Sequence, residues 1–368
     1  MPIKYDIDTF AEDYYEAREK FLAACAALPG KLHQFQHPTL HYQNQPLSTD
    51  VFWLGPKQAD KVLVVISATH GVEGFCGSAA QVNWLKHEAL PDNDIALLFI
   101  HALNPFGFAY LRRVNEDNID LNRNFIDFSE VPSNEGYREL APFLLPAQWT
   151  EAANRETHAK IDDYRKRYGQ RQTEVAISGG QYQYSDGLFY GGSGPSWSRL
   201  NVESIFRQYR LSERSGVAVI DIHSGLGPYG YGEVISDHPP QSAGATMAKC
   251  WFGDSVTEPA CGTSTSVPKW GLQDYAWHAA FGDRGCYVTL EFGTYSVDDM
   301  FGVLCEENYY RQQLNRDGAA SAQYQAAQQR LRDYFFPNKN DWKEMVLFRS
   351  GQVLCQALEG LRAGPVSC

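Results

Sequence analysis

A histidine and a glutamate stand three residues apart, directly after a strongly apolar run of the chain. His70 and Glu73 belong to the segment 69–74, and the run 61–67 before them is rich in β-branched residues. Such a run is typical of a strand buried on both faces, so both side chains should leave the end of that strand on one loop. Imidazole nitrogen and carboxylate oxygen are ligands that zinc accepts. The pair therefore indicates a candidate metal site, although His-x-x-Glu also arises often by chance.

Two further predicted strands end in side chains of the same chemistry. His223 follows the apolar segment 216–222, and Glu291 follows the segment 286–290. A single histidine is more often a hydrogen-bonded core or surface residue, but a carboxylate on an apolar strand is costly to bury without a partner or a function. Two histidines and one glutamate make the ligand set of a catalytic zinc ion, which keeps its fourth position open. A separate glutamate can then act as a base.

Basic and amide side chains gather in the loop after the predicted strand 95–101. The loop contains the segment 104–107, then Arg112 and Arg113, and then the segment 120–125. A solvated basic loop is the simpler explanation of these arginines. In an acidic protein, however, arginines in a polar loop beside a metal site are suited to recognising an anion.

The elements that must position these residues alternate between strands and helices. Edge strands are predicted near 38–43 and 50–54, buried strands at 61–67, 95–101, 216–222 and 286–290, and helices at 8–28 and near 76–89, 136–143 and 148–168. This alternation predicts an α/β fold with a mixed, mostly parallel central sheet flanked by helices. In such folds the functional loops lie at the carboxyl ends of the strands.

The whole chain, residues 1–368, is predicted to form a single domain. The segment 127–195 is polar and mixed and contains a Gly-rich stretch, and no linker flanks it. We interpret it as an insertion that decorates the same domain. The C-terminal region 299–361 is predicted to be largely helical, with a break near Pro337.

Composition and charge argue against several classes of function. The 368-residue chain has 32 Lys and Arg against 44 Asp and Glu, a formal net charge of −12, which disfavours nonspecific binding to nucleic acid. The sequence has no run of about 18 apolar residues and no basic-then-apolar N-terminal segment, so we expect neither a membrane span nor a secretory signal. Eight cysteines without a Cys-x-x-Cys pair are expected to be reduced thiols. These features predict a cytoplasmic protein and leave its oligomeric state open.

The motifs taken together resemble a known family of enzymes. In chain order they are the segments 70–73, 104–107, 120–125 and 222–224, followed by Glu291. Their residue types and order are similar to those of the zinc metallocarboxypeptidases, including their aspartoacylase and succinylglutamate desuccinylase relatives. Within that superfamily the chain resembles a little-characterised bacterial branch of carboxypeptidase-like proteins. The resemblance implies a carboxypeptidase-like (phosphorylase/hydrolase-like) fold and amide hydrolysis that uses one zinc ion.

The resemblance also implies a role for each matched residue around the metal. His70, Glu73 and His223 would bind the zinc ion, and Asp120 would hydrogen-bond the first of these ligands. A carboxylate in that position fixes the imidazole tautomer and raises its basicity. Glu291 would be the general base.

Substrate recognition would fall to the basic loop. The resemblance gives Arg113 the role of polarising the scissile carbonyl, and Arg112 is its competitor for that role. Asn122 and Arg123 would hold a carboxylate of the substrate.

One feature of the family pattern is missing from the sequence. Carboxypeptidases usually carry a mobile tyrosine several residues before a Gly-x-x-Asp segment, which the segment 271–274 resembles here. The preceding stretch 263–268 contains no tyrosine. Tyr275 and Tyr295 are nearby but do not align with the family residue, so the group that would cap the substrate is not assigned.

Three functions remain open at this point. The first is a carboxypeptidase that acts on a small peptide with a free carboxylate, and the second is an aspartoacylase-like deacylase of small N-acyl amino acids that uses the same groups. The third is a non-catalytic binding protein that retains the fold. The joint presence of His70, Glu73, His223 and Glu291 disfavours the third, because a decayed site would have lost at least one of them.

Overall fold

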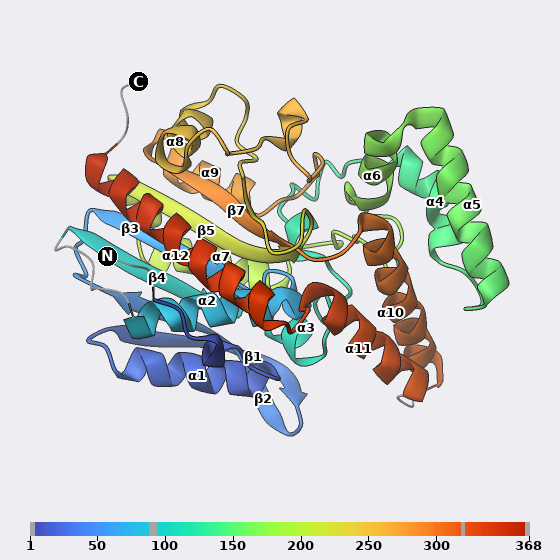
Figure 1. Ribbon diagram of the computed structural model, residues 1–368, viewed down its shortest axis with the longest axis horizontal. Helices are drawn as coiled ribbons and strands as arrows, with labels where there is room; N and C mark the ends of the chain where they lie inside the picture. The colour runs from blue at the N-terminus through green and yellow to red at the C-terminus, as the bar shows by residue number, and fades with distance from the viewer. Residues whose placement is uncertain (1–3, 88–93, 318–320, 365–368) are drawn as a thin grey trace.

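A seven-stranded sheet forms the centre of the molecule, as the computed structural model shows for residues 4–87, 94–317 and 321–364 (Figure 1). The strand order is β1-β2-β4-β3-β5-β7-β6. The strands are β1 (Lys31–Tyr42), β2 (Gln45–Leu54), β3 (Lys61–Ser67), β4 (Ile95–His101), β5 (Gly216–Gly225), β6 (Gly232–Ile235) and β7 (Gly285–Gly293). The central strands β4, β3, β5 and β7 are parallel, whereas β1, β2 and β6 pair antiparallel. The predicted mixed, mostly parallel α/β sheet is therefore confirmed.

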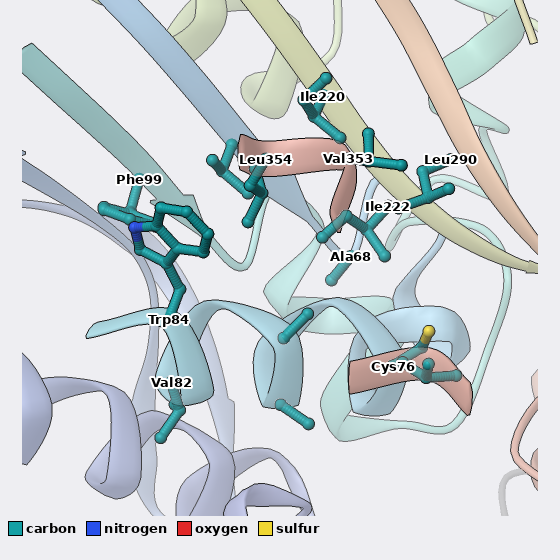
Figure 2. Packing of buried hydrophobic residues seen from close by; sticks show 14 of the residues in the cluster. Ala68, Cys76, Val82, Trp84, Phe99, Ile220, Ile222, Leu290, Val353 and Leu354 are labelled. Atoms are coloured by element: carbon teal, nitrogen blue, oxygen red, sulfur yellow. The ribbon is translucent and has the colours of Figure 1, made fainter. Parts of the chain in front are cut away.

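Helices cover both faces of this sheet, because side chains alternate between the faces along each strand. On one face Leu63 and Ile220 pack with α1 (Tyr14–Ala26), α2 (Gly74–His87), α8 (Ala243–Phe252) and α12 (Asn340–Ala363). Figure 2 shows part of this core, where Trp84 of α2 and Leu354 of α12 meet strand residues. On the other face the neighbouring Val62 and Val219 pack with α7 (Trp197–Gln208) and α9 (Asp274–Phe281).

A third apolar cluster lies beyond the carboxyl ends of the parallel strands. It joins α4 (Glu135–Leu144), α5 (Glu151–Tyr168) and α6 (Gln170–Ser178) to α10 (Val297–Asp317) and α11 (Ala322–Phe335). These five helices gather at one end of the molecule in Figure 1. Val72, just after β3, belongs to the cluster and Leu226, just after β5, packs against it. The helices therefore form a wall beside the loops that leave the sheet.

Most predicted elements exist, with shifted boundaries. The N-terminal helix begins later than predicted, because the side chain of Asp13 accepts a hydrogen bond from the backbone of Glu16 and caps α1 there. The edge strands β1 and β2 are longer than predicted, and β6, α6, α7, α8 and α9 were not predicted. The C-terminal region is helical and is broken after Phe335, as expected. The assignment of 127–195 to an insertion in a single domain stays a prediction; that range contains α4, α5 and α6.

No helix within the described ranges is long and apolar enough to cross a bilayer. Cys25, Cys76, Cys286 and Cys305 are buried in the packed interior. Cys368 lies outside the described residues.

Candidate metal centre

Three ligand-type side chains converge where β3 and β5 end. His70 precedes the 3-10 turn η2 (Gly71–Glu73) that follows β3, Glu73 is its last residue, and His223 lies on β5, the parallel neighbour of β3. The Nδ1 atoms of the two histidines are 3.2 Å apart. Glu73 Oε1 lies 3.0 Å from His70 Nδ1, and its Oε2 lies 3.0 Å from His223 Nδ1. All three side chains are buried.

The turn that carries His70 and Glu73 is held by its close approach to a second segment. A Cβ atom on Gly71 would lie 2.0 Å from the carbonyl carbon of Gly107, in α3 (Pro105–Ala109), so only glycine fits there. The backbone N–H groups of Gly71 and Val72 donate to the carbonyls of Arg113 and Arg112. The turn that carries His70 and Glu73 is therefore fixed against the loop that carries Arg112 and Arg113.

Each histidine also meets a carboxylate through its other ring nitrogen. His70 Nε2 lies 3.1 Å from Asp120 Oδ1, and His223 Nε2 lies 2.6 Å from Asp221 Oδ2. At His223 this carboxylate holds the proton on Nε2 and leaves the lone pair of Nδ1 free to bind a metal, whereas His70 Nε2 also lies 2.8 Å from Arg113 Nη2. Asp120 thus occupies the place expected of it. Asp221 was not predicted, although its spacing of two residues from His223 on a strand puts both side chains on one face.

The Asp221 carboxylate is itself fixed by three more hydrogen bonds. It accepts from the hydroxyls of Thr69 and Tyr287 and from the amide of Gln273. These donors come from three different elements, so the orientation of His223 depends on packing that is distant in sequence.

This donor set fits one zinc ion. With ligand bonds of about 2.0–2.1 Å, the ligand atoms of a tetrahedral site are separated by roughly 3.3 Å, which is close to the distances of 3.0–3.2 Å among the three residues. Their ligand atoms all lie within 4.8 Å of one another, and they form the one such group among the described residues. Two neutral imidazoles and one carboxylate also match the ligand chemistry that zinc prefers.

Glu291 lies beside this cluster without belonging to it. It is the register partner of His223 in the β5–β7 pair, and its Oε1 accepts a hydrogen bond of 3.0 Å from the backbone of Leu226. Burial and repulsion from Glu73 raise the pKa of Glu291 to about 7, although His223 acts in the opposite direction. A buried carboxylate with a pKa near neutrality is suited to taking up and releasing a proton.

Arg113 is the arginine whose side chain lies at the cluster. Its Nη1 is 2.9 Å from Glu73 Oε1 and its Nε is 3.1 Å from Asp120 Oδ2, and its guanidinium lies over the ring of Phe189. Although burial opposes it, Arg113, Arg123 and His70 hold the pKa of Asp120 well below its usual value. Asp120 is therefore a stable anion that orients one histidine and one arginine.

The structure places Arg112 elsewhere, contrary to its expected role as a substrate-binding residue and as a competitor of Arg113. Arg112 is buried, and its Nε is 2.6 Å from Glu307 Oε1 in α10, with Asn118 as a further partner. It does not line the pocket that His70, Glu73 and His223 line. Arg112 faces the helical wall because Glu307 neutralises it there.

Asn122 and Arg123 both line that pocket, but many of their polar atoms already form hydrogen bonds within the protein. The Arg123 guanidinium donates to the carbonyl of Ser178 at 2.6 and 3.1 Å and to that of Asn122 at 2.6 Å. The amide oxygen of Asn122 accepts from the backbone of Gln273 at 3.2 Å. The remaining N–H groups of Arg123 and the NH₂ of Asn122 are the donors left for a ligand.

The pocket is lined on one side by the three candidate metal ligands and on the other by Met300 and Phe301 of the helical wall. Several of its lining residues were not predicted: Ser178, Phe189, Asp237, Lys269 and Met300. They come from α6, α10 and irregular loops, and no spacing pattern in the sequence links them to the motifs. Neither Tyr275 nor Tyr295 lines the pocket, and the Tyr275 hydroxyl donates to the carbonyl of Lys269.

A family model described as "Protein of unknown function (DUF2817)" matches residues 10–349. The chain belongs to the DUF2817 family. No protein with curated annotation matches the chain.

Several solved structures are similar to this DUF2817 chain. Carboxypeptidase A from Helicoverpa armigera is 14% identical, with 90% of this chain and 76% of that chain covered and a TM-score of 0.46. A metallo-carboxypeptidase from Burkholderia cenocepacia is 13% identical, with coverages of 94% and 68% and a TM-score of 0.46. The murein-tripeptide amidase MpaA from Escherichia coli O157 is 15% identical, with coverages of 82% and 97% and a TM-score of 0.35.

Proposed function

We propose that the protein is a zinc-dependent hydrolase that cleaves an amide bond, acting as a carboxypeptidase on a small substrate with a free carboxylate. The observation that carries the proposal is that the Nδ1 atoms of His70 and His223 and the carboxylate oxygens of Glu73 converge on one point. A second glutamate, Glu291, lies on the strand next to His223. The proposal that these three residues hold one zinc ion follows from that arrangement.

When bound, zinc supplies Lewis-acid chemistry that polarises a carbonyl and makes water more acidic. Glu291 accepts the proton of the attacking water and passes it to the departing amine. Its burial and its pKa of about 7 favour both directions of that transfer. Arg113 donates hydrogen bonds to the carbonyl oxygen as negative charge develops on it.

The carboxylate of the substrate is assigned to Asn122 and Arg123. The committed hydrogen bonds of Arg123 to Ser178 and Asn122 hold its guanidinium in place, so its free N–H groups are already oriented before the substrate binds. Restricting the guanidinium in advance lowers the entropy cost of binding a carboxylate.

The size of the pocket supports a second candidate. Its cavity volume is about 70 Å³, below the range of typical small-molecule sites, which suits an aspartoacylase-like deacylase of small N-acyl amino acids as well as a peptidase that admits one terminal residue. The acyl side of the scissile amide would differ between the two, while the ligands and the base would be the same.

A substrate panel tests the proposal. Zinc-loaded protein is assayed against peptides with varied C-terminal residues and against N-acyl amino acids, with a chelator control and zinc restored afterwards. We expect chelator-sensitive release of an amino acid, and the preferred acyl group separates peptidase from deacylase. A protein that binds no zinc and hydrolyses none of these substrates would instead favour a binding protein that keeps the fold.

A further inference from the structure

One cation of the pocket, Lys269, has no role in the proposed reaction. Lys269 lines the same pocket as Arg113 and Arg123 but belongs to the loop before α9, far from the motifs in sequence. Its Nζ donates to the hydroxyl of Ser266 and, at 2.8 Å, to the carbonyl of Val267. Both acceptors are neutral, and an ammonium has three donors, so one N–H remains for another partner.

No carboxylate of the described residues forms an ion pair with this ammonium. Asp237 and Glu291 act on Lys269 electrostatically from the same pocket, but neither is within ion-pair distance. Burial and the nearby Arg123 lower the pKa of Lys269 to about 8, so it remains mostly charged at pH 7. A half-buried ammonium with no carboxylate within ion-pair distance is stabilised when a ligand brings an anionic group to its free N–H.

The loop that carries Lys269 is fastened to the segment that carries the carboxylate-binding residues. The backbone of Phe125 donates to the carbonyl of Gly271, and a Cβ atom on Gly271, where φ is +74°, would lie 2.2 Å from the carbonyl oxygen of Arg123. The backbone of Trp270 donates to the carbonyl of Gly179, next to the Ser178 that holds Arg123. Lys269 and Arg123 are therefore parts of one rigid wall of the pocket.

We propose that Lys269 is a specificity-determining residue that binds a second anionic group of the substrate, so that the preferred substrate carries an acidic side chain in addition to its free carboxylate. The proposal rests on the proposed function and identifies its substrate class. Arg123 and Asn122 take one carboxylate, and the ammonium takes the carboxylate at the end of a glutamate-like or aspartate-like side chain. A charged hydrogen bond of this kind changes affinity by roughly tenfold or more.

Binding of two matched probes tests this assignment without requiring turnover. N-acetyl-L-glutamate and N-acetyl-L-glutamine have nearly the same shape and differ in the charge of the side chain. Their affinities are measured by titration calorimetry on the zinc-loaded full chain carrying Glu291→Gln, with Lys269→Met added in one sample and Lys166→Met in another. Lys166 is an exposed lysine that pairs with Asp163 on the surface of α5, so it serves as the matched control.

We expect the glutamate probe to bind about tenfold more tightly or better, the preference to fall to within about twofold in Lys269→Met, and the Lys166→Met sample to keep it. A ratio near one in the parent protein, a ratio unchanged by Lys269→Met, or failure of both probes to bind would overturn the assignment. A Lys269-dependent preference in a protein that hydrolyses nothing would retain the anion site and reject the hydrolase. Hydrolysis with no Lys269-dependent preference would do the reverse.

Discussion

His223 and Glu291 are register partners on the parallel strands β5 and β7. The pairing puts a candidate metal ligand and a candidate base on adjacent buried strands of the central sheet. Glu291 needs no loop closure to reach the site, because the sheet itself sets its distance from His223. The chemistry proposed for the two residues therefore depends on a backbone arrangement that is present before any substrate binds.

Replacing Glu291 by Gln should separate metal binding from turnover. The change removes the proposed base but leaves His70, Glu73 and His223 intact, so we expect zinc content to stay near one ion per chain. Activity should fall by about 10²–10⁴-fold, the usual contribution of a general base. Metal analysis and steady-state kinetics measure the two effects. Glu344→Gln, at an exposed position of α12, is the matched control, and near-normal activity in Glu291→Gln would show that the base is another group.

Replacing Asp221 by Asn should weaken zinc binding. The carboxylate that orients His223 through a 2.6 Å contact becomes a neutral amide, which supports the Nδ1 lone pair less well. Loss of such a partner lowers metal affinity by about 10–100-fold, and competition with a chromophoric chelator measures it. Asp60→Asn, at an exposed position, should bind zinc as tightly as the parent protein. Equal affinity in Asp221→Asn would remove Asp221 from the metal site.

The acid limb of activity should follow the ionisation of Glu291. A base must be deprotonated, and burial raises the pKa of Glu291 to about 7, so kcat/KM should fall tenfold per pH unit below the midpoint. A bound dication stabilises the carboxylate and moves the midpoint below 7, but it should stay above the ordinary glutamate value of 4.5. The residual activity of Glu291→Gln should lack this limb. An identical limb in that variant would assign the ionisation to a different residue.

Replacing Arg112 by Met should destabilise the fold without emptying the metal site. The change leaves Glu307 buried and unpaired, which costs about 3–5 kcal/mol of unfolding free energy. Urea unfolding followed by tryptophan fluorescence measures the loss. Arg155→Met, which breaks an exposed pair with Glu151, should cost less than about 1 kcal/mol. If Arg112→Met combined with Glu307→Leu is no more stable than the single variant, the unpaired charge is not the cause.

Replacing Gly71 by Ala should disrupt the ligand turn. The new Cβ would lie 2.0 Å from the carbonyl carbon of Gly107, and backbone atoms on both sides must move to admit it. We expect a loss of zinc affinity together with about 1–3 kcal/mol of stability. A Cβ atom added to Gly302 in α10 would meet no atom within 4 Å, so Gly302→Ala should be neutral or slightly stabilising. Normal zinc binding in Gly71→Ala would show that the turn tolerates displacement.

The sequence predicts that the three candidate metal ligands lie close together, because they lie at the ends of strands with clear β-branched runs. His70, Glu73 and His223 each come directly after or within a β-branched run, and the parallel order of those strands brings their carboxyl ends together. The contact of Asp221 with His223 could have been predicted in the same way, because residues two apart on a strand lie on the same face. The short strand β6, with four residues, offers too little pattern to be predicted.

Residues whose positions depend on distant partners could not be predicted in this way. Arg112 and Arg113 are adjacent, and only Glu307, 195 residues further along, decides that Arg112 faces the helical wall. Lys269 and Phe189 reach the pocket through loops without periodicity, so only the packing of those loops reveals them. Local patterns fix what lies on the sheet, whereas long-range packing fixes what surrounds it.

The hydrogen bonds from Arg123 to the carbonyl of Ser178, at the end of α6, have a consequence for how the protein can change. These bonds hold the guanidinium that is proposed to bind the substrate. They connect it to α6, and none of the three candidate metal ligands takes part in them. Substitutions near Ser178 should therefore change substrate affinity more than zinc affinity, and variants with new substrate ranges should be sought at that end of α6. The core of α4, α5 and α6 is a different case, because Val72, between His70 and Glu73, packs in the same apolar cluster.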